Sequence, residues 1–160
     1  NSLLNRRGLA KVSRTPGKTR AVNLFQIATS DPGLANFYLV DLPGYGFAKV
    51  SKSIRAEWGP LIESYVAEQP SLITVVLLVE CRVVTEQDRQ TVAWLQSIGR
   101  DPVIVATKVD KLKPSERVRT LRQTHRDLGL PEGQQLIPYS VVTGEGRDHL
   151  WGVLRDLVKT

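Results

Sequence analysis

The sequence predicts an α/β domain built on a mostly parallel sheet, and three observations carry this prediction. Two apolar runs, residues 72–79 and 103–106, contain no charged side chain, as expected of central strands that are covered on both faces. Helical patterns follow each run, so that strands and helices alternate along the chain. Short polar motifs stand directly after three of the predicted strands, where ligands of such sheets bind.

One domain is expected over residues 1–160. The chain has 160 residues, of which 41% are hydrophobic, and this is enough for one compact core. The single cysteine, Cys81, excludes a disulfide framework and suits a reducing compartment. No apolar run approaches the roughly 20 residues of a membrane helix, and the N-terminus lacks the pattern of a signal peptide. We therefore expect a cytoplasmic protein without a membrane partner.

The first half of the chain begins with a predicted hairpin. Residues 21–27 and 36–41 are strand-like, and the turn sequence Ser-Asp-Pro-Gly at 30–33 separates them. Apolar residues at helical spacing then predict a helix over residues 54–66. Gly59-Pro60 should kink or break this helix.

Three further helices and one strand complete the pattern. Thr85 and Asp88 are spaced as a capping-box pair at the start of a helix. Ser115 is expected to cap the next helix. The buried stripe of that helix is expected to comprise Val118, Leu121, His125 and Leu128. Residues 136–139 form the last predicted strand, and residues 148–158 form an amphipathic helix.

The positive charge is concentrated near the N-terminus. The net charge is +6, and residues 1–55 carry nine Lys or Arg residues against two Asp residues, a local charge of +7. The remaining residues have a net charge of −1. A basic patch of this kind attracts polyphosphate and can hold RNA by releasing counterions. The alternative is a solvated basic face with no partner.

The polar motif Asp41-Leu42-Pro43-Gly44 follows the second strand of the predicted hairpin. Asp41 could bind Mg²⁺ through a coordinated water, because this ion sheds its hydration shell reluctantly. Gly44 has no Cβ, so its amide could approach a terminal phosphate. The alternative is a strand that ends in an ordinary Pro-Gly turn.

The segment Thr15-Pro16-Gly17-Lys18-Thr19 ends like a phosphate-binding loop but does not fit one. That motif needs a glycine at position 12, a preceding strand and a following helix, whereas the chain has valine there and a strand follows. We instead expect Gly17, Lys18 and Thr19 on a mobile loop beside a nucleotide. Thr19 would offer its hydroxyl to Mg²⁺ and its amide to the terminal phosphate. The alternative is a turn that leads into the hairpin.

Two motifs after the later strands predict guanine recognition. Asp110, in Thr107-Lys108-Val109-Asp110, could accept hydrogen bonds from both donors on the edge of guanine, a pair that adenine lacks. Lys108 could lay its aliphatic stem along the base, and Thr107 could brace the loop. In the segment Ser140-Val141-Val142, amides around Ser140 and Val141 could donate to the guanine O6. The alternatives are a solvated approach to a helix and a glycine-rich turn.

These motifs carry a resemblance that covers nearly the whole chain. The EngB/YsxC (YihA) family of bacterial ribosome-biogenesis GTPases has a similar signature set, here T-P-G-K-T-R at 15–20, D-L-P-G-Y-G at 41–46, T-K-V-D at 107–110 and S-V-V-T-G-E-G at 140–146. The resemblance implies a Ras-like P-loop GTPase domain, a three-layer α/β sandwich that binds GTP or GDP with Mg²⁺.

The resemblance also assigns roles to residues. Thr19 and Asp41 match the metal-binding residues, and Leu42, Pro43 and Gly44 match the second switch. The guanine-reading residues would be Thr107, Lys108, Asp110, Ser140, Val141 and Val142. Glu80 stands where the family usually has an aspartate.

The chain departs from the family at its start. The family opens with a strand and a G-x-S-N-x-G-K-S loop, and residues 1–5 resemble the segment directly after that loop. We therefore expect the N-terminal strand and the phosphate loop to precede Asn1 in the natural protein. Without them, the chain should hold phosphates weakly and hydrolyse GTP poorly.

Tyr45 occupies the position at which many GTPases have a glutamine that orients the attacking water. A phenol cannot present the amide's paired donor and acceptor, so hydrolysis should be slow and depend on a partner, an ion or a rearranged loop, and no catalytic residue is assigned. The expected function is a monomeric, slow GTPase switch that helps to assemble the large ribosomal subunit and, through it, supports cell division. Its partners would be the subunit precursor and its rRNA, held by basic loops around Lys11, Arg14, Lys49 and Lys52. The alternative is a guanine-nucleotide-sensing module that binds RNA or the ribosome without significant hydrolysis.

Overall fold

The computed structural model of the chain describes residues 1–6, 8–9, 23–28, 36–42 and 52–159. The chain divides into two compact units. The first comprises Asn1, Leu3–Leu72 and Arg155–Thr160, and the second comprises Ser2 and Ile73–Leu154. Each unit is described by itself, and the expectation of one domain over residues 1–160 stays a prediction.

The first unit contains the predicted hairpin. Strands β1 (Asn23–Ile27) and β2 (Phe37–Asp41) pair antiparallel, with Asn23 opposite Asp41. Exposed and half-buried residues alternate along β1, as expected of a two-stranded ribbon with one wet face. The turn sequence at residues 30–33 lies outside the described residues. The antiparallel register places Asp41 at the end of β2, as the sequence predicted.

Helix α1 (Lys52–Glu68) continues through Pro60, so of the two predicted effects of Gly59-Pro60 the break does not occur, and the kink stays a prediction. A proline inside a helix costs about 3 kcal/mol, because it removes one hydrogen bond and crowds the preceding turn. Ile62 and Val66 lie one turn apart and are both buried. Burial of two aliphatic side chains contributes a similar amount of free energy, which explains why the helix continues.

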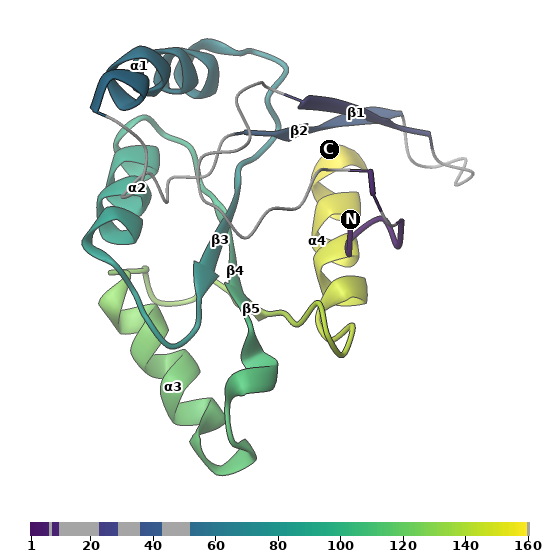
Figure 1. The fold of residues 1–160 in the computed structure, drawn as a ribbon, viewed down its shortest axis with the longest axis vertical. Coiled ribbons are helices and arrows are strands. Elements are labelled where there is room, and N and C mark those ends of the chain that lie inside the picture. Colours follow the sequence, from purple (N-terminus) through teal and green to yellow (C-terminus); the bar gives the residue numbers. More distant parts are fainter. Residues whose placement is uncertain (7, 10–22, 29–35, 43–51, 160) are drawn as a thin grey trace. The chain divides into compact units, whose positions relative to one another are not determined.

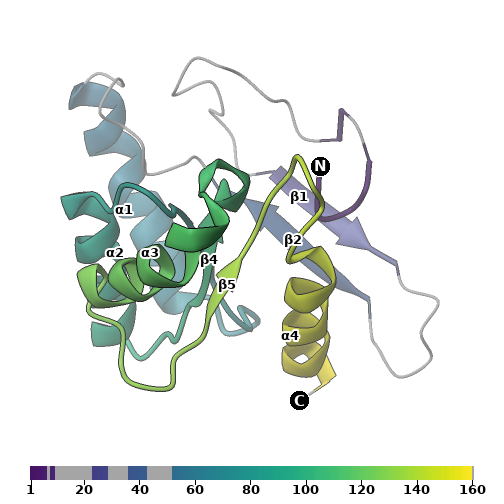
Figure 2. The same ribbon diagram turned by 90° about the horizontal axis from the view of Figure 1, so that it is seen from below.

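The second unit is a three-layer α/β sandwich. Strands β3 (Val76–Glu80), β4 (Val103–Thr107) and β5 (Leu136–Pro138) form a parallel sheet in that order. Helices α2 (Glu86–Ser97) and α3 (Pro114–Asp127) cover one side of the sheet, and the part of α4 (Arg147–Lys159) that belongs to this unit, up to Leu154, covers the other (Figures 1 and 2). Because all three strands are parallel, their carboxyl ends meet at one edge of the sheet.

The two apolar runs have different positions in this sheet. Ile104, Val105 and Ala106 of β4 are fully buried, as predicted for a central strand. In β3, Leu77 is buried but Leu78 is 62% exposed, and β3 is an edge strand among the described strands. The expectation that both faces of the first run are covered is therefore wrong for the described part of the chain.

The predicted N-terminal cap of α2 is confirmed, and that of α3 is not. Thr85 and Asp88 form the expected capping box, with Thr85 N donating to Asp88 Oδ2 at 2.7 Å. Helix α3 begins at Pro114, because the fixed φ of a proline suits the first helical position. Ser115 therefore lies inside the helix, and the predicted cap at Ser115 is wrong. Among the described residues, no helix combines the length and apolarity needed to span a bilayer.

The buried face of α3 differs from the predicted stripe. Val118 is 60% exposed, whereas Thr124 is buried and its single hydroxyl proton is shared between two acceptors, Cys81 O at 2.8 Å and Thr120 O at 2.9 Å. A threonine can occupy a core position here because this shared hydrogen bond offsets the cost of burying its hydroxyl. His125 stays at the boundary, with Nε2 3.0 Å from Gln134 O.

Candidate functional site

The site is built at the carboxyl ends of β4 and β5. The chain leaves β4 at Thr107, whose hydroxyl donates to Val79 O of β3 at 3.0 Å. Lys108 then adopts a left-handed conformation with φ of 61° and precedes the short helix η2 (Val109–Lys111). Val109 N donates to Tyr139 O at 3.3 Å, which holds this turn against the end of β5. The two predicted base-reading motifs are therefore neighbours.

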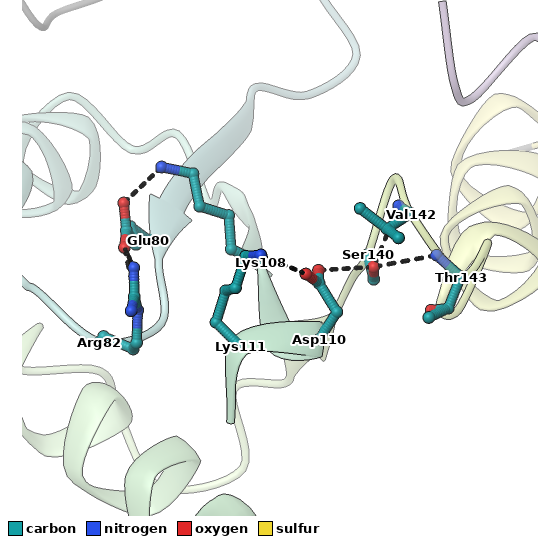
Figure 3. Close-up of polar contacts among 8 residues, drawn as sticks. All are labelled: Glu80, Arg82, Lys108, Asp110, Lys111, Ser140, Val142 and Thr143. Atoms are coloured by element: carbon teal, nitrogen blue, oxygen red, sulfur yellow. Dashed lines mark hydrogen bonds and ion pairs between the residues drawn. The ribbon is translucent and has the colours of Figure 1, made fainter. Parts of the chain in front are cut away.

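Asp110 and Ser140 form the centre of the site (Figure 3). The Ser140 hydroxyl donates to Asp110 Oδ1 at 2.7 Å and accepts from the amides of Val142 and Thr143 at 3.1 and 3.2 Å. Ser140 is completely buried, so these bonds satisfy its hydroxyl and fix its rotamer. The carboxylate is thereby held in one orientation on a turn that is itself tied to the sheet.

The same hydrogen bond governs the ionisation of Asp110. Donation by the Ser140 hydroxyl, more than any other contact, holds the pKa of the Asp110 carboxyl below its ordinary value, and partial desolvation opposes this effect. The Lys111 ammonium, 3.8 Å from Asp110 Oδ2, acts in the same direction as Ser140. Asp110 is therefore an ionised, acceptor-only group at neutral pH.

The backbone hydrogen bonds of the Ser140 loop decide which of the two predicted amides, Ser140 or Val141, could donate to a base. Ser140 N donates to Glu145 O at 3.0 Å, so its amide is already occupied and cannot serve as the predicted donor to a base. Val141 is 70% exposed. No hydrogen bond is recorded for its amide among the described residues. Of the two predicted amides, Val141 is the one placed to donate to a ligand.

A glycine closes this loop. Gly146 has φ of 79°, and a Cβ built on it would overlap the carbonyl oxygen of Pro138 at the end of β5. Only glycine satisfies both the positive φ and this close approach. The Ser140 loop is also joined to α3, because Glu145 forms an ion pair with Arg117.

Glu80 and Arg82 form a second cluster that the sequence did not predict as part of the site. Lys108 Nζ lies 2.6 Å from Glu80 Oε2, and Arg82 Nη2 lies 2.6 Å from Glu80 Oε1. These two bonds, the one from Lys108 first, hold the pKa of Glu80 below its ordinary value. Figure 3 shows the Lys108 side chain extending from the end of β4 towards Glu80, while Asp110 faces Ser140. Parallel pairing sets Glu80, the last residue of β3, opposite Thr107, so Lys108 follows one residue later; the sequence shows the charge after the first apolar run but not this register.

The predicted metal and phosphate residues lie in the first unit. Asp41 is half-buried at the end of β2, and Asn23 Nδ2 donates to its Oδ2 at a long 3.5 Å. A carboxylate with one weak amide contact is an oxygen donor of the kind that Mg²⁺ takes. The described residues contain no group of three His, Cys, Asp or Glu that could hold a metal ion by itself. Gly17, Lys18, Thr19, Pro43, Gly44 and Tyr45 lie outside the described residues, so their roles stay predictions.

Comparisons with known proteins agree on the family. The family model described as "50S ribosome-binding GTPase" matches residues 1–108. A "Probable GTP-binding protein EngB" of Clostridium perfringens (strain 13 / Type A) is 45% identical over 157 residues, which are 98% of this chain and 77% of the relative. The protein of the same name from Alkaliphilus metalliredigens is 40% identical over 158 residues, with 98% and 73% of the two chains covered.

Solved structures show the same fold. A crystal structure of "a probable GTP-binding protein engB" matches with a TM-score of 0.71 at 16% identity and covers 99% of this chain and 91% of that one. The FeoB G-domain from Methanococcus jannaschii matches with a TM-score of 0.55 at 18% identity, with 86% and 80% of the two chains covered. The fold is thus that of the Ras-like GTPases, and the chain belongs to the EngB family of GTP-binding proteins.

Proposed function

We propose that the complete protein is a slow, GTP-dependent switch that acts in assembly of the large ribosomal subunit and supports cell division through that role. The observation that carries the proposal is the fixed, ionised carboxylate of Asp110 at the edge of the sheet. GTP and GDP are the proposed ligands, and the monomer in the cytoplasm is the proposed form. The switch assignment rests on the family, since the chain's relatives are named as GTP-binding proteins.

Selection of guanine would depend on Asp110. Guanine presents a ring N–H and an exocyclic amine side by side, and a carboxylate can accept from both. Asp110 keeps free lone pairs after accepting from Ser140, and its orientation is fixed before the base arrives. The Val141 amide would donate to the guanine O6 and reject the amino group that adenine has there. Thr107, Lys108 and Val142 would shape the rest of this base site.

The proposed metal- and phosphate-binding residues belong to the first unit. Asp41 and Thr19 would hold Mg²⁺, and Gly17, Lys18, Leu42, Pro43 and Gly44 would line the phosphate side. When bound, Mg²⁺ would neutralise charge on the phosphate oxygens. Asp41 supports this assignment with its position at the strand end and its carboxylate chemistry. Tyr45 would leave the attacking water without an orienting amide, which makes hydrolysis slow.

A preceding segment would complete the fold. We propose that, in the natural protein, a strand N-terminal to Asn1 pairs with the free edge of β3 and leads into the phosphate loop. Two features of the described chain support this proposal. No described strand pairs with that edge of β3, and Leu78 on the same strand presents an apolar side chain to solvent.

Nucleotide selection and ribosome-dependent cleavage test the proposal together. Cleavage of GTP by the complete protein should be slow under single-turnover conditions and should accelerate when large-subunit precursor particles are added. Asp110→Asn should lose the preference for guanine by roughly hundredfold or more, because the charge is lost and the NH2 group of asparagine faces one of guanine's donors in place of an acceptor oxygen. It should gain affinity for xanthosine triphosphate, whose base carries an acceptor where guanine has its amine.

Three results would contradict parts of this proposal. An unchanged GTP preference in Asp110→Asn would contradict the assignment of Asp110 to the base site. Fast multiple turnover by the protein alone would contradict the proposal of a slow switch. Cleavage that stays negligible with and without particles, alongside tight GTP binding, would favour the alternative of a nucleotide-sensing module that binds RNA.

A further inference from the structure

Helix α3 carries three exposed arginines on one face. Arg119, Arg122 and Arg126 follow one another at spacings of three and four residues, so they line up along the helix. With a rise of 1.5 Å per residue, the three Cα atoms span about 10 Å of the helix axis. We call these three residues the α3 arginine stripe.

Few acidic residues neutralise the charge of the stripe. Among the described residues, no ion pair is recorded for Arg119, Arg122 or Arg126, although Arg126 donates to Gln123 Oε1 at 2.6 Å. The segment 108–126 contains seven Lys or Arg residues and only two acidic residues. This local excess is hidden in the total charge, because the acidic remainder of residues 56–160 balances it.

The face of α3 opposite the stripe packs against the core and fixes the helix in place. Leu121 packs against the buried cluster of Cys81, Ala106 and Val109, and Leu128 is buried just beyond the last turn. The Thr124 hydroxyl ties the helix to the end of β3 through its bond to Cys81 O. The stripe therefore stands on a helix that is fixed to the sheet, which lowers the entropy cost of presenting three arginines to a ligand.

A concave surface borders the stripe. Leu121, Arg122, His125, Arg126 and Leu136 line a depression of about 340 Å³. Arg122 and Arg126 belong both to the stripe and to the lining of this depression. The His125 ring is held by its contact with Gln134 O. A planar imidazole and guanidinium groups at a hollow are suited to an unstacked base or a sugar-phosphate turn.

We infer that the α3 arginine stripe is a contact surface for the phosphate backbone of ribosomal RNA. The inference rests on the proposed ribosomal role and adds a surface to the basic loops that the sequence singled out. Three guanidinium groups over about 10 Å match the charge spacing of about three phosphates along one strand. The description of the matching family model supplies an RNA-rich partner, the large ribosomal subunit.

A lipid membrane fits this surface less well. Membrane-surface helices insert an apolar face between the headgroups, but the apolar face of α3 is already used by the core. The exposed side offers one large apolar residue, Val118. Charge without insertable apolar surface is the pattern of a nucleic-acid contact.

The test compares two variants of the complete protein with matched charge. The stripe variant carries Arg119→Gln, Arg122→Gln and Arg126→Gln, and the control variant carries Arg89→Gln, Arg100→Gln and Lys159→Gln at scattered positions. Dissociation constants are measured over about 50 to 200 mM salt for large-subunit particles and for protein-free large-subunit rRNA, with a non-hydrolysable GTP analogue present. Glutamine preserves helix propensity, and thermal unfolding monitors the fold of each variant.

The stripe variant should bind both probes about tenfold or more weakly. Its plot of log K against log salt should flatten by about 2 to 3, one unit for each phosphate that the variant no longer touches. The control variant should keep the original slope. A third variant with lysine at the three stripe positions should recover most of the slope, since it keeps the charges. Guanine selectivity should be unchanged in all three variants.

Several outcomes would overturn the inference. Equal losses in the stripe and control variants would mean that only total charge matters. Weaker binding to particles with normal binding to free rRNA would assign the stripe to an acidic protein instead. Failure of the unmodified protein to bind either probe would contradict both the RNA contact of the stripe and the proposed ribosomal role. The nucleotide selectivity of Asp110→Asn would still test the base site independently.

Discussion

At the scale of single residues, the site depends on two carboxylates with different partners. Asp110 accepts from the buried Ser140 hydroxyl, whereas Glu80 accepts from Lys108 and Arg82. Asp110, Lys108 and Ser140 could be predicted because polar motifs at strand ends are visible in the sequence. Glu80 stands out in the sequence only as an unusual residue, since its contact with Lys108 depends on how two strands 27 residues apart pair in register.

Glu80 gives the first prediction at this scale. If its carboxylate holds Lys108 in the orientation that covers the base, Glu80→Gln should weaken guanine-nucleotide binding about two- to fivefold, the range of an exposed ion pair. Stability should hardly change. The matched control is Glu86→Gln, which removes an exposed ion pair with Arg89 on helix α2, and neither of these described residues contacts Lys108 in a recorded ion pair. Nucleotide affinity can be measured by calorimetry across pH.

The pH dependence follows from the direction of the shift. The folded-state pKa of Glu80 is depressed, so its ion pairs are complete above the ordinary carboxylate pKa and are lost as pH falls through the lower, folded value. The difference between wild type and Glu80→Gln should therefore be constant from pH 5 to 8 and disappear only in stronger acid, below about pH 4. Equal affinity of the two proteins at neutral pH would show that Glu80 does not position Lys108.

At the scale of elements, the sequence patterns predicted which helices and strands exist and in what order better than they predicted the buried face or the continuity of a helix. The capping box at Thr85 involves residues three apart and was predictable from local spacing. The buried face of α3 was not predictable in this way, because a hydrogen bond from the Thr124 hydroxyl to Cys81 O, a residue distant in the chain, lets Thr124 occupy the core in place of the more apolar Val118. Pro60 in α1 is a similar case, in which packing of Ile62 and Val66 offsets a local penalty.

The loop from β5 to α4 carries the second prediction. Gly146→Ala should destabilise the protein by more than about 2 kcal/mol, since it adds a clash with the Pro138 carbonyl to the cost of a positive φ. Gly144→Ala is the matched control, because Gly144 has nearly the same φ but open space around a Cβ, and should cost only about 1 kcal/mol. Urea unfolding measures both. The idea that close approach shapes this loop fails if the two variants lose equal stability.

At the scale of the whole molecule, the parallel sheet and the position of the loops that follow β4 and β5 could be predicted, and the environment of β3 could not. Apolar runs and strand-end motifs are properties of short segments, so the sequence reveals them. Whether both faces of a strand are covered depends on segments distant in the chain. Residues 72–79 and 103–106 look alike as sequence, yet Ile104, Val105 and Ala106 at the centre of β4 are buried, whereas Leu78 at the centre of β3 is exposed.

Leu78 therefore tests the proposed strand before Asn1. In the 160-residue chain, Leu78→Thr should change stability by less than about 0.5 kcal/mol, because the side chain is already exposed and threonine suits a strand. In a chain extended by the natural protein's preceding residues, the same change should cost about 1 to 3 kcal/mol, since the side chain would be buried there. Leu77→Thr is the control, because Leu77 is buried in the described chain and should be costly at both lengths. Urea unfolding of the four variants and their two parents gives each difference. A Leu78→Thr cost that is equally small at both lengths would mean that no added segment covers this side of β3.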